Sequence, residues 1–344
     1  MFTLNPARRT ARRPLAIGVA AASLALLAGC AAPASAPPGG VVSLPPTLEQ
    51  SGTDYPLTID NCGTEVTFEA APERVITIKS TSTEALLALG LGERIVGTAF
   101  GDGPAAATWQ AEAEALPVLS DKLPGQEATL ELEPDLVYAG WESNLSAEGA
   151  GDRATLAALG VNSLVSSAAC KAEAYRPNPL TFDAVFADIE QLGEIFDVQD
   201  AAATLIAGQQ AELAAVQPAG AGRTALWYSS GNDTPYVGAG IGAPQMILDA
   251  LELENVAASV QDSWAPLGWE AIVAADPDVI VLVDAAWNTA ESKIALLESN
   301  PATAELSAVQ AGRYLTVPFP AGEAGVRNVE AVASLNTQLA ALDG

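Results

Sequence analysis

The sequence contains no histidine among its 344 residues. This absence excludes a Ser-His-Asp or Cys-His nucleophile pair and a histidine general base. It also excludes imidazole ligands for zinc or for haem iron. We therefore expect no metal site built on histidine, no cofactor and no catalysis of these kinds.

Basic residues are scarce, with 15 Lys and Arg against 42 Asp and Glu. Four of the 15 are arginines among residues 1–29, so only 11 remain in the rest of the chain. A surface this acidic argues against binding to nucleic acid and against electrostatic binding to anionic lipid. Any attachment to a membrane therefore needs another cause.

Long hydrophobic runs are also absent. The longest, Leu15 to Ala28, is too short to cross a bilayer about 30 Å thick, but it suits the core of a signal peptide at 1–29. Leu27-Ala-Gly-Cys30 then resembles the lipobox of bacterial lipoproteins, which implies that Cys30 carries a lipid. An ordinary secreted protein is the alternative. The pair Arg12-Arg13 leaves Sec and twin-arginine export both open.

The segment 30–53 is rich in Ala, Pro, Gly and Ser, and it predicts a flexible tether after the lipidated cysteine. Only two other cysteines are present, Cys62 and Cys170. Because an exported protein meets oxidising conditions, we expect them to form a disulfide, the alternative being two separate buried thiols.

One motif occurs twice. Glu127 and Glu270 each open a short amphipathic helix, a Pro-Asp turn follows at Pro134 or Pro277, and an apolar strand comes next. Coincidence is the alternative, since this connection is common in α/β proteins. The recurrence predicts two lobes of similar plan.

Strands alternate with helices on both sides of this motif, which predicts parallel sheets covered by helices. The fold class is therefore α/β, with two Rossmann-like lobes joined by a long helix. The boundaries are 54–198 for the N-terminal lobe, 199–221 for the connecting helix and 222–344 for the C-terminal lobe. Within the first lobe, Thr81 and Glu84 have capping-box spacing and predict a helix that begins at Glu84.

Five stretches carry a resemblance to a known family, namely Arg74-Val-Ile-Thr-Ile, Glu84-Ala-Leu-Leu-Ala-Leu-Gly-Leu, Leu132-Glu-Pro-Asp-Leu-Val, Leu251-Glu-Leu-Glu-Asn-Val and Pro277-Asp-Val-Ile-Val-Leu. With them, the chain resembles the solute-binding proteins of bacterial ABC importers for ferric siderophores and cobalamin, the class III periplasmic binding proteins. The resemblance implies a ligand cleft between the lobes, and an ABC permease and its ATPase as partners. It also implies a monomer on the outer face of the cell membrane.

In the family that the chain resembles, one glutamate of each lobe docks onto the permease, and the matching residues are Glu127 and Glu270. The simpler alternative is that each carboxylate only stabilises a helix N-terminus.

Ligands of open parallel sheets bind at the carboxyl ends of the strands and in the loops that follow. This rule, with the resemblance, selects the cleft candidates Lys79, Ser80, Thr81, Phe100, Asp121, Lys122, Trp141, Glu142, Trp227, Tyr228, Ser229, Tyr236, Trp264, Trp287, Phe319 and Arg327. Asp121 stands where cobalamin binders have an aromatic residue, which argues against cobalamin.

Lys79 and Arg327 are the candidate contacts for an anion, and four of the cleft candidates are tryptophans that could stack on a flat ligand. The alternatives are solvated cations and tryptophans packed in the core. Cys62-Gly-Thr-Glu, Leu119-Ser-Asp-Lys, Tyr138-Ala-Gly-Trp-Glu-Ser-Asn and Trp227-Tyr-Ser-Ser-Gly look like the actinobacterial subgroup thought to import the deazaflavin phospholactate precursor of factor 420. A ferric siderophore is the second candidate ligand.

An exported hydrolase is the competing function. Ser229 and Ser230 lack the G-x-S-x-G elbow, and no histidine is present to activate a serine. Glu142 and Asp284 could form an acid-base pair, but their spacing does not require it. We expect a binding protein, not an enzyme.

Overall fold

The computed structural model describes residues 52–342. The expected signal peptide, Cys30 and nearly all of the expected tether lie outside these residues. Within them, no helix is both long and apolar enough to span a membrane.

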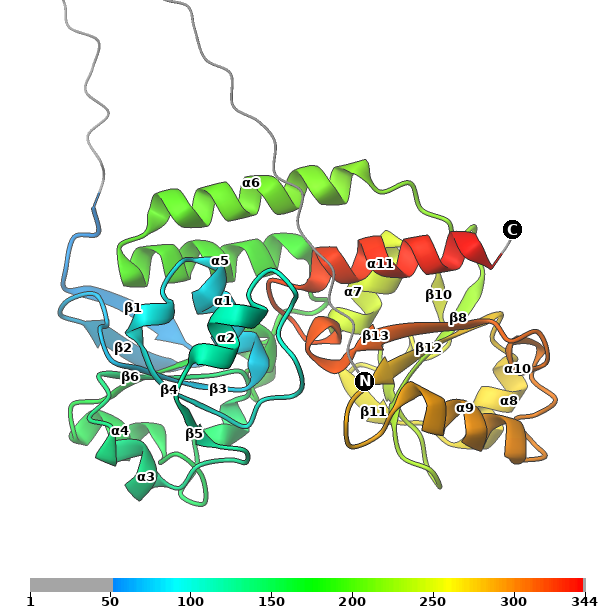
Figure 1. Cartoon of the computed structure of the whole chain (residues 1–344), viewed down its shortest axis with the longest axis horizontal. Helices are drawn as coiled ribbons and strands as arrows, with labels where there is room; N and C mark the ends of the chain where they lie inside the picture. Colours follow the sequence, from blue (N-terminus) through cyan, green and yellow to red (C-terminus); the bar gives the residue numbers. More distant parts are fainter. Residues whose placement is uncertain (1–51, 343–344) are drawn as a thin grey trace, which may run out of the picture. The chain divides into compact units, whose positions relative to one another are not determined.

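Two sheets organise residues 52–342 (Figure 1). Their strands are β3 (Val75–Ile78), β4 (Ile95–Ala99), β5 (Val118–Ser120), β6 (Leu136–Ala139), β7 (Asn162–Val165), β8 (Thr224–Ser230), β9 (Tyr236–Gly238), β10 (Glu254–Asn255), β11 (Trp264–Pro266), β12 (Val279–Asp284) and β13 (Tyr314–Pro318). A separate antiparallel hairpin joins β1 (Leu57–Asn61) to β2 (Thr64–Phe68), as the turn at Cys62 and Gly63 predicts.

The helices are α1 (Ser80–Ala88), α2 (Gln110–Ala115), α3 (Gln126–Glu131), α4 (Arg153–Ala158), α5 (Phe182–Phe196), α6 (Gln199–Ala215), α7 (Ala243–Ala250), α8 (Trp269–Ala275), α9 (Ala290–Ser299), α10 (Ser307–Gln310) and α11 (Asn328–Ala341). Between the two sheets in the sequence lie α5 and α6, which Figure 1 shows side by side in green.

The first sheet has the strand order β5-β4-β3-β6-β7, and all of its neighbouring strands are parallel. The second sheet has the order β11-β9-β8-β12-β13, with β10 beside β8. Its strands β8, β12 and β13 are parallel, whereas β9 and β11 are antiparallel. Strands β3, β6 and β12 are nearly continuous buried apolar runs because helices cover parallel sheets on both faces.

The repeated Pro-Asp turn does the same structural task in both sheets. The Asp135 carboxylate accepts hydrogen bonds from the backbone N–H groups of Glu73 (2.7 Å) and Arg74 (3.0 Å), at the start of β3. The Asp278 carboxylate accepts one from the N–H of Thr224 (2.9 Å), at the start of β8. The aspartate before β6 therefore holds the start of the neighbouring strand β3, and the aspartate before β12 holds the start of the neighbouring strand β8.

The start of α11 packs into the core of the first half. Met246 of α7, Val326 and Val329 join a buried apolar cluster that also holds side chains of α1 and α5. Gln209 of α6 donates a hydrogen bond to the carbonyl of Val326 (2.7 Å). The ends of the two sheets that carry the candidate site are therefore held together by apolar packing as well as by polar contacts.

The capping-box prediction at Thr81 and Glu84 was wrong. Helix α1 begins at Ser80, and Lys79 occupies the N-cap position with a φ of 82° and no side-chain cap. A lysine at positive φ is strained by about 1–3 kcal/mol. The contacts of its side chain, described below, offset that cost.

Candidate functional site: an aromatic pocket between the two sheets

A pocket of about 480 Å³ lies between segments that follow β6 and β7 of the first sheet and segments at the ends of β8, β12 and β13 of the second. This volume is in the range of small-molecule sites. Its lining includes Thr81, Trp141, Glu142, Lys171, Arg176, Ser229, Tyr236, Asp262, Trp264, Trp287, Phe319 and Glu323. Eight of the sixteen cleft candidates line this pocket. Seven of them, all except Thr81 of α1, stand at the ends of strands or in the loops beside them, where open parallel sheets bind ligands.

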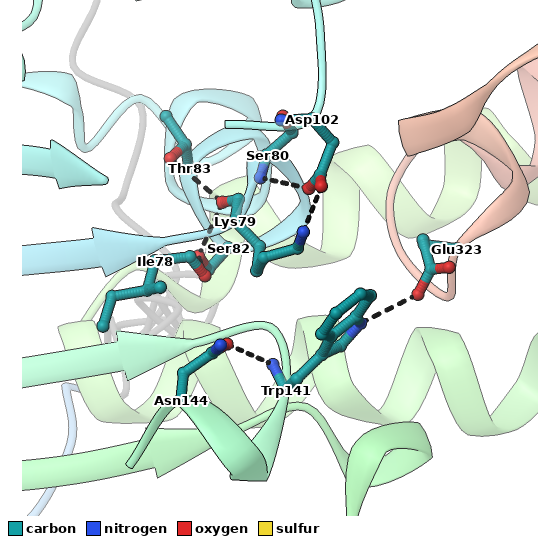
Figure 2. A network of polar contacts seen from close by, with 9 residues as sticks. All are labelled: Ile78, Lys79, Ser80, Ser82, Thr83, Asp102, Trp141, Asn144 and Glu323. Atoms are coloured by element: carbon teal, nitrogen blue, oxygen red, sulfur yellow. Dashed lines mark hydrogen bonds and ion pairs between the residues drawn. The ribbon is translucent and has the colours of Figure 1, made fainter. Parts of the chain in front are cut away.

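The Lys79 side chain lies below this pocket, with only 3% of its surface exposed. Its ammonium forms an ion pair with Asp102 (Figure 2). It also lies over the rings of Trp141 (4.0 Å to the centroid), Phe100 (4.2 Å) and Phe319 (5.6 Å). A carboxylate and three aromatic faces therefore already surround this cation, and it is absent from the pocket wall.

Burial raises the pKa of Asp102, and the Lys79 ammonium acts against that shift. The Asp102 carboxylate also accepts a hydrogen bond from the N–H of Ser80 (3.3 Å), and the Ser80 hydroxyl accepts one from the N–H of Asp102 (2.8 Å). These reciprocal bonds tie the loop after β4 to the start of α1. They fix the ammonium of Lys79 against the face of the Trp141 ring.

Trp141 connects the two halves of the protein. Its indole N–H donates a hydrogen bond to the carboxylate of Glu323 at 3.0 Å (Figure 2). The residue before it, Gly140, has no room for a side chain, because a Cβ there would lie 2.7 Å from Thr81 Oγ1 and 2.9 Å from Lys79 Cβ. The bond to Glu323 and the tight packing around Gly140 thus hold the Trp141 ring in one place.

Glu323 is a half-buried residue whose side chain lines the pocket. Its pKa is raised to about 7, mainly by burial and also by the charge of Asp102, although the hydrogen bond from Trp141 and the charge of Lys79 oppose the rise. Near neutral pH the group therefore exists in both protonation states.

A second buried ion pair joins the halves outside the pocket wall. Arg327, 6% exposed, contacts Glu84 at 3.4 Å and the carbonyl of Pro104 at 3.3 Å. Burial raises the pKa of Glu84 to about 7, although the guanidinium of Arg327 opposes the rise. Arg327 also lies 3.7 Å from the exposed Glu330. Its charge is thus engaged by protein carboxylates.

The wall that follows β7 carries the cations of the pocket. A disulfide between Cys62 and Cys170, with a Cα separation of 5.2 Å, confirms the expected bridge and fixes this wall to the β1-β2 hairpin. The Glu142 carboxylate accepts a hydrogen bond from the N–H of Lys171 (2.6 Å). Arg176 contacts Asp262 of the other half at 3.3 Å. In residues 52–342, the Lys171 ammonium has no ion-pair partner.

The opposite rim is aromatic. The Trp287 side chain is 59% exposed, and its ring meets that of Phe319 edge to face with centroids 5.8 Å apart. Tyr236 is 43% exposed, and Trp264 is half-buried. These rings offer stacking surfaces to a flat ligand.

The remaining cleft candidates lie elsewhere. Trp227 and Tyr228 are fully buried in the core, so neither reaches the pocket. Ser80 and Asp121 line a separate, smaller hollow, and Lys122 is exposed outside the main pocket. Phe100 lies against the Lys79 ammonium and does not line the main pocket.

Four charged lining residues were missed by the sequence reasoning, namely Lys171, Arg176, Asp262 and Glu323. The position of Lys171 and Arg176 after the strand β7 is a signal that could have found them. Asp262 and Glu323 lie in loops without a periodic pattern.

The residues of the competing hydrolase hypothesis do not form a catalytic pair. Glu142 binds the N–H of Lys171, whereas Asp284 accepts a hydrogen bond from the N–H of Ala290 at 2.9 Å. Ser229 is 3% exposed. Over residues 52–342, no group of three or more Cys, Asp or Glu side chains is placed to hold a metal ion.

Residues 75–321 match the sequence model of one known family, described as periplasmic binding protein. The chain belongs to the periplasmic binding protein family. A relative from Bacillus subtilis strain 168, the uncharacterized ABC transporter substrate-binding lipoprotein YvrC, is 26% identical over 330 residues, which cover 90% of this chain and 91% of that protein.

Two solved structures share the two-lobe fold. A periplasmic binding protein from Veillonella parvula is 26% identical with a TM-score of 0.72, over 82% of this chain and 96% of that one. An ABC-type Fe³⁺-hydroxamate transport protein from Saccharomonospora viridis is 28% identical with a TM-score of 0.71, over 83% and 99%. The α/β prediction with two lobes is confirmed. The protein is a substrate-binding protein of the ABC-transporter type, a class that acts outside the cytoplasm and is generally not enzymatic.

Proposed function

We propose that this protein captures an anionic, flat aromatic ligand for an ABC importer, and that the ligand is the deazaflavin phospholactate precursor of factor 420. The observation that carries the proposal is the composition of the pocket wall. Trp141, Trp264 and Trp287 line the same cavity as the cations Lys171 and Arg176. Rings stack on a planar body, and a guanidinium recognises phosphate or carboxylate in a bidentate manner.

Titration of the purified protein tests this cargo. Quenching of tryptophan fluorescence is followed while deazaflavin phospholactate is added, and a ferric hydroxamate siderophore is titrated in parallel. Saturable binding of the deazaflavin with little response to the siderophore is expected. Saturation by the siderophore alone would reject the deazaflavin assignment.

A ferric hydroxamate siderophore is the second candidate ligand, favoured by the likeness to the Saccharomonospora viridis protein. Residues 52–342 offer no cluster of metal ligands, so the iron would have to arrive already enclosed by its chelator. In that case Lys171 and Arg176 would meet the charge of the chelate, and the aromatic rim would cover its apolar surface.

Glu127 and Glu270 are our proposed permease contacts. Both are exposed, and they stand in the first turns of α3 and α8, at the heads of the two repeats. We expect Glu127→Ala combined with Glu270→Ala to abolish uptake while ligand affinity stays unchanged. Glu212→Ala, an exposed carboxylate of α6, is the control. Normal uptake by the double variant would refute the docking role.

We also propose that a lipid on Cys30 anchors the protein, as a monomer, to the outer face of the cell membrane, with residues 30–53 as the tether. The acidic composition supports a lipid instead of a charge-based anchor. Cys30→Ser should release the protein from the membrane fraction into the medium. Retention of the variant on the membrane would contradict the lipid anchor.

A further inference from the structure

The pocket contains charged groups of both signs, and they are not equally engaged. Its carboxylates belong to Glu142, Asp262 and Glu323. The first accepts a backbone N–H at 2.6 Å, and the second pairs with Arg176 and accepts the N–H of Ser263 at 2.8 Å. Across residues 52–342, the carboxylate of Glu323 accepts only the indole N–H of Trp141. A carboxylate has about four acceptor sites, so Glu323 retains capacity for a ligand.

No cation forms an ion pair with Glu323 in the described chain. Lys79 lies nearby, but its ammonium is bound to Asp102 and covered by the Trp141 ring (Figure 2). The charged and titratable groups that act on Glu323 are Asp102 and Lys79, and Tyr236 is the group on which Glu323 itself acts. An ionised carboxylate with one donor and no cation is costly within a protein, and a ligand that supplies a second donor reduces that cost.

The cations lie in a different part of the wall. Arg176 has 20% of its side chain exposed, and its partner Asp262 has 52% exposed. An ion pair this open contributes little, so an acidic ligand can take the place of Asp262 on the guanidinium. Lys171 belongs to the same disulfide-anchored segment.

We propose that Glu323 determines specificity by accepting a hydrogen bond from an N–H group on the flat body of the ligand, while Arg176 and Lys171 bind its acidic group. The pocket thus selects a molecule that carries a donor at one position and an acid at another, joined by an aromatic plane. This inference rests on the proposed function, because the imide N–H of a deazaflavin and its phospholactate are such groups.

The test measures dissociation constants of the purified protein at pH 6 and pH 8 for deazaflavin phospholactate and for the same deazaflavin without the phospholactate. The variants are Glu323→Gln, which keeps the shape of the side chain, and Arg176→Gln. Glu212→Gln on α6 and the exposed Lys122→Gln are the matched controls.

Glu323→Gln should weaken both ligands about 10- to 100-fold at pH 8. The ratio of wild-type affinity to the affinity of Glu323→Gln should fall from pH 8 to pH 6, because Glu323 gains its proton over this interval. Arg176→Gln should weaken only the phospholactate compound, and both controls should bind like wild type.

Unchanged affinity of Glu323→Gln, with the same pH dependence as wild type, would overturn the inference. A loss of affinity for the compound without phospholactate in Arg176→Gln would also overturn it. If wild-type protein binds neither compound, the cargo assignment itself is wrong and this inference falls with it. The pH comparison uses only the wild type and Glu323→Gln, so it does not depend on whether Arg176→Gln folds. Thermal unfolding verifies that Glu323→Gln is folded.

Discussion

The two halves of the protein each bring a tryptophan to the pocket in the loop after the repeated strand, but they support it differently. Trp141 follows β6, is half-buried, covers the ammonium of Lys79 and donates to Glu323. Trp287 follows β12, is 59% exposed and has one ring contact, with Phe319. One wall of the pocket is therefore fixed before a ligand arrives, whereas the other has a side chain free to adapt to it.

A buried lysine lies behind each of these loops, and the two also differ. Lys79 pairs with Asp102 and touches Trp141 itself. Lys293, 1% exposed, donates to the carbonyls of Val283 (2.7 Å) and Asn288 (2.6 Å), on either side of Trp287. The first lysine orients the ring, and the second holds only the backbone of the loop.

The largest effect should come from removing Trp141. Trp141→Ala takes away the ring that covers Lys79 and the donor to Glu323, and it should lower the free energy of unfolding by about 3–5 kcal/mol. Trp287→Ala should change it by less than about 0.5 kcal/mol because that side chain is exposed. Urea unfolding of both variants measures the difference. Equal losses would contradict the contrast between the walls.

Breaking the ion pair below Trp141 should have the next largest effect. Lys79→Met leaves Asp102 as a buried carboxylate without its cation, and we expect a loss of about 3 kcal/mol. Lys79→Met with Asp102→Asn should regain part of that loss, because no charge then remains buried. Chemical denaturation of the single and double variants measures the coupling, and purely additive losses would argue against it.

In the other half, Lys293→Met should cost less, about 1–3 kcal/mol, because it removes one donor from each of two carbonyls but leaves no buried carboxylate without its cation. Any loss of ligand affinity in this variant should come only from contacts that the Trp287 loop makes. Unfolding and binding measured on the same preparation test this, and a loss as large as that of Lys79→Met would remove the distinction between the lysines.

The smallest effect, taken per unit of pH, concerns the two carboxyls with raised pKa values. The pKa of Glu84 and that of Glu323 are raised to about 7 in the folded protein from 4.5, so each group keeps its proton in the folded state across that interval. The folded state then binds more protons than the unfolded one, and stability falls as pH rises from about 4.5 to 7. Each carboxyl contributes at most about 1.4 kcal/mol per pH unit.

Glu84→Gln and Glu323→Gln should each flatten the fall in stability over this interval, and the exposed Glu212→Gln should not. The free energy of unfolding is measured at half-unit steps from pH 4.5 to 7.5. A wild-type slope in both variants would show that these two carboxyls do not retain their protons in the folded protein.

Much of the fold could be predicted because its signals are local. Asp135 and Asp278 follow the same turn in two repeats, and the buried runs of β6 and β12 come next in both. The disulfide prediction followed from the compartment and was confirmed. The start of α1 was placed wrongly because the pairing of Lys79 with Asp102 supports a strained backbone that capping rules do not anticipate.

The candidate site was predicted less well because its charges are balanced by residues distant in the sequence. Lys79 and Arg327 read as available cations, yet each is bound to a buried carboxylate, and Glu84 lies 243 residues from Arg327. Trp141 meets Glu323 across 182 residues. No periodic pattern in the sequence predicts such contacts. The aromatic residues in loops at strand ends, by contrast, follow from the topology alone.

The most direct test of the account uses the six tryptophans as internal reporters. Protein labelled with 5-fluorotryptophan is studied by ¹⁹F NMR before and after saturation with deazaflavin phospholactate, with resonances assigned from single Trp→Phe variants. We predict shifts for the pocket residues Trp141, Trp264 and Trp287, the largest at Trp287, and none for Trp109, Trp227 and Trp269. Saturable binding that shifts only the latter three would contradict a ligand site between the two sheets.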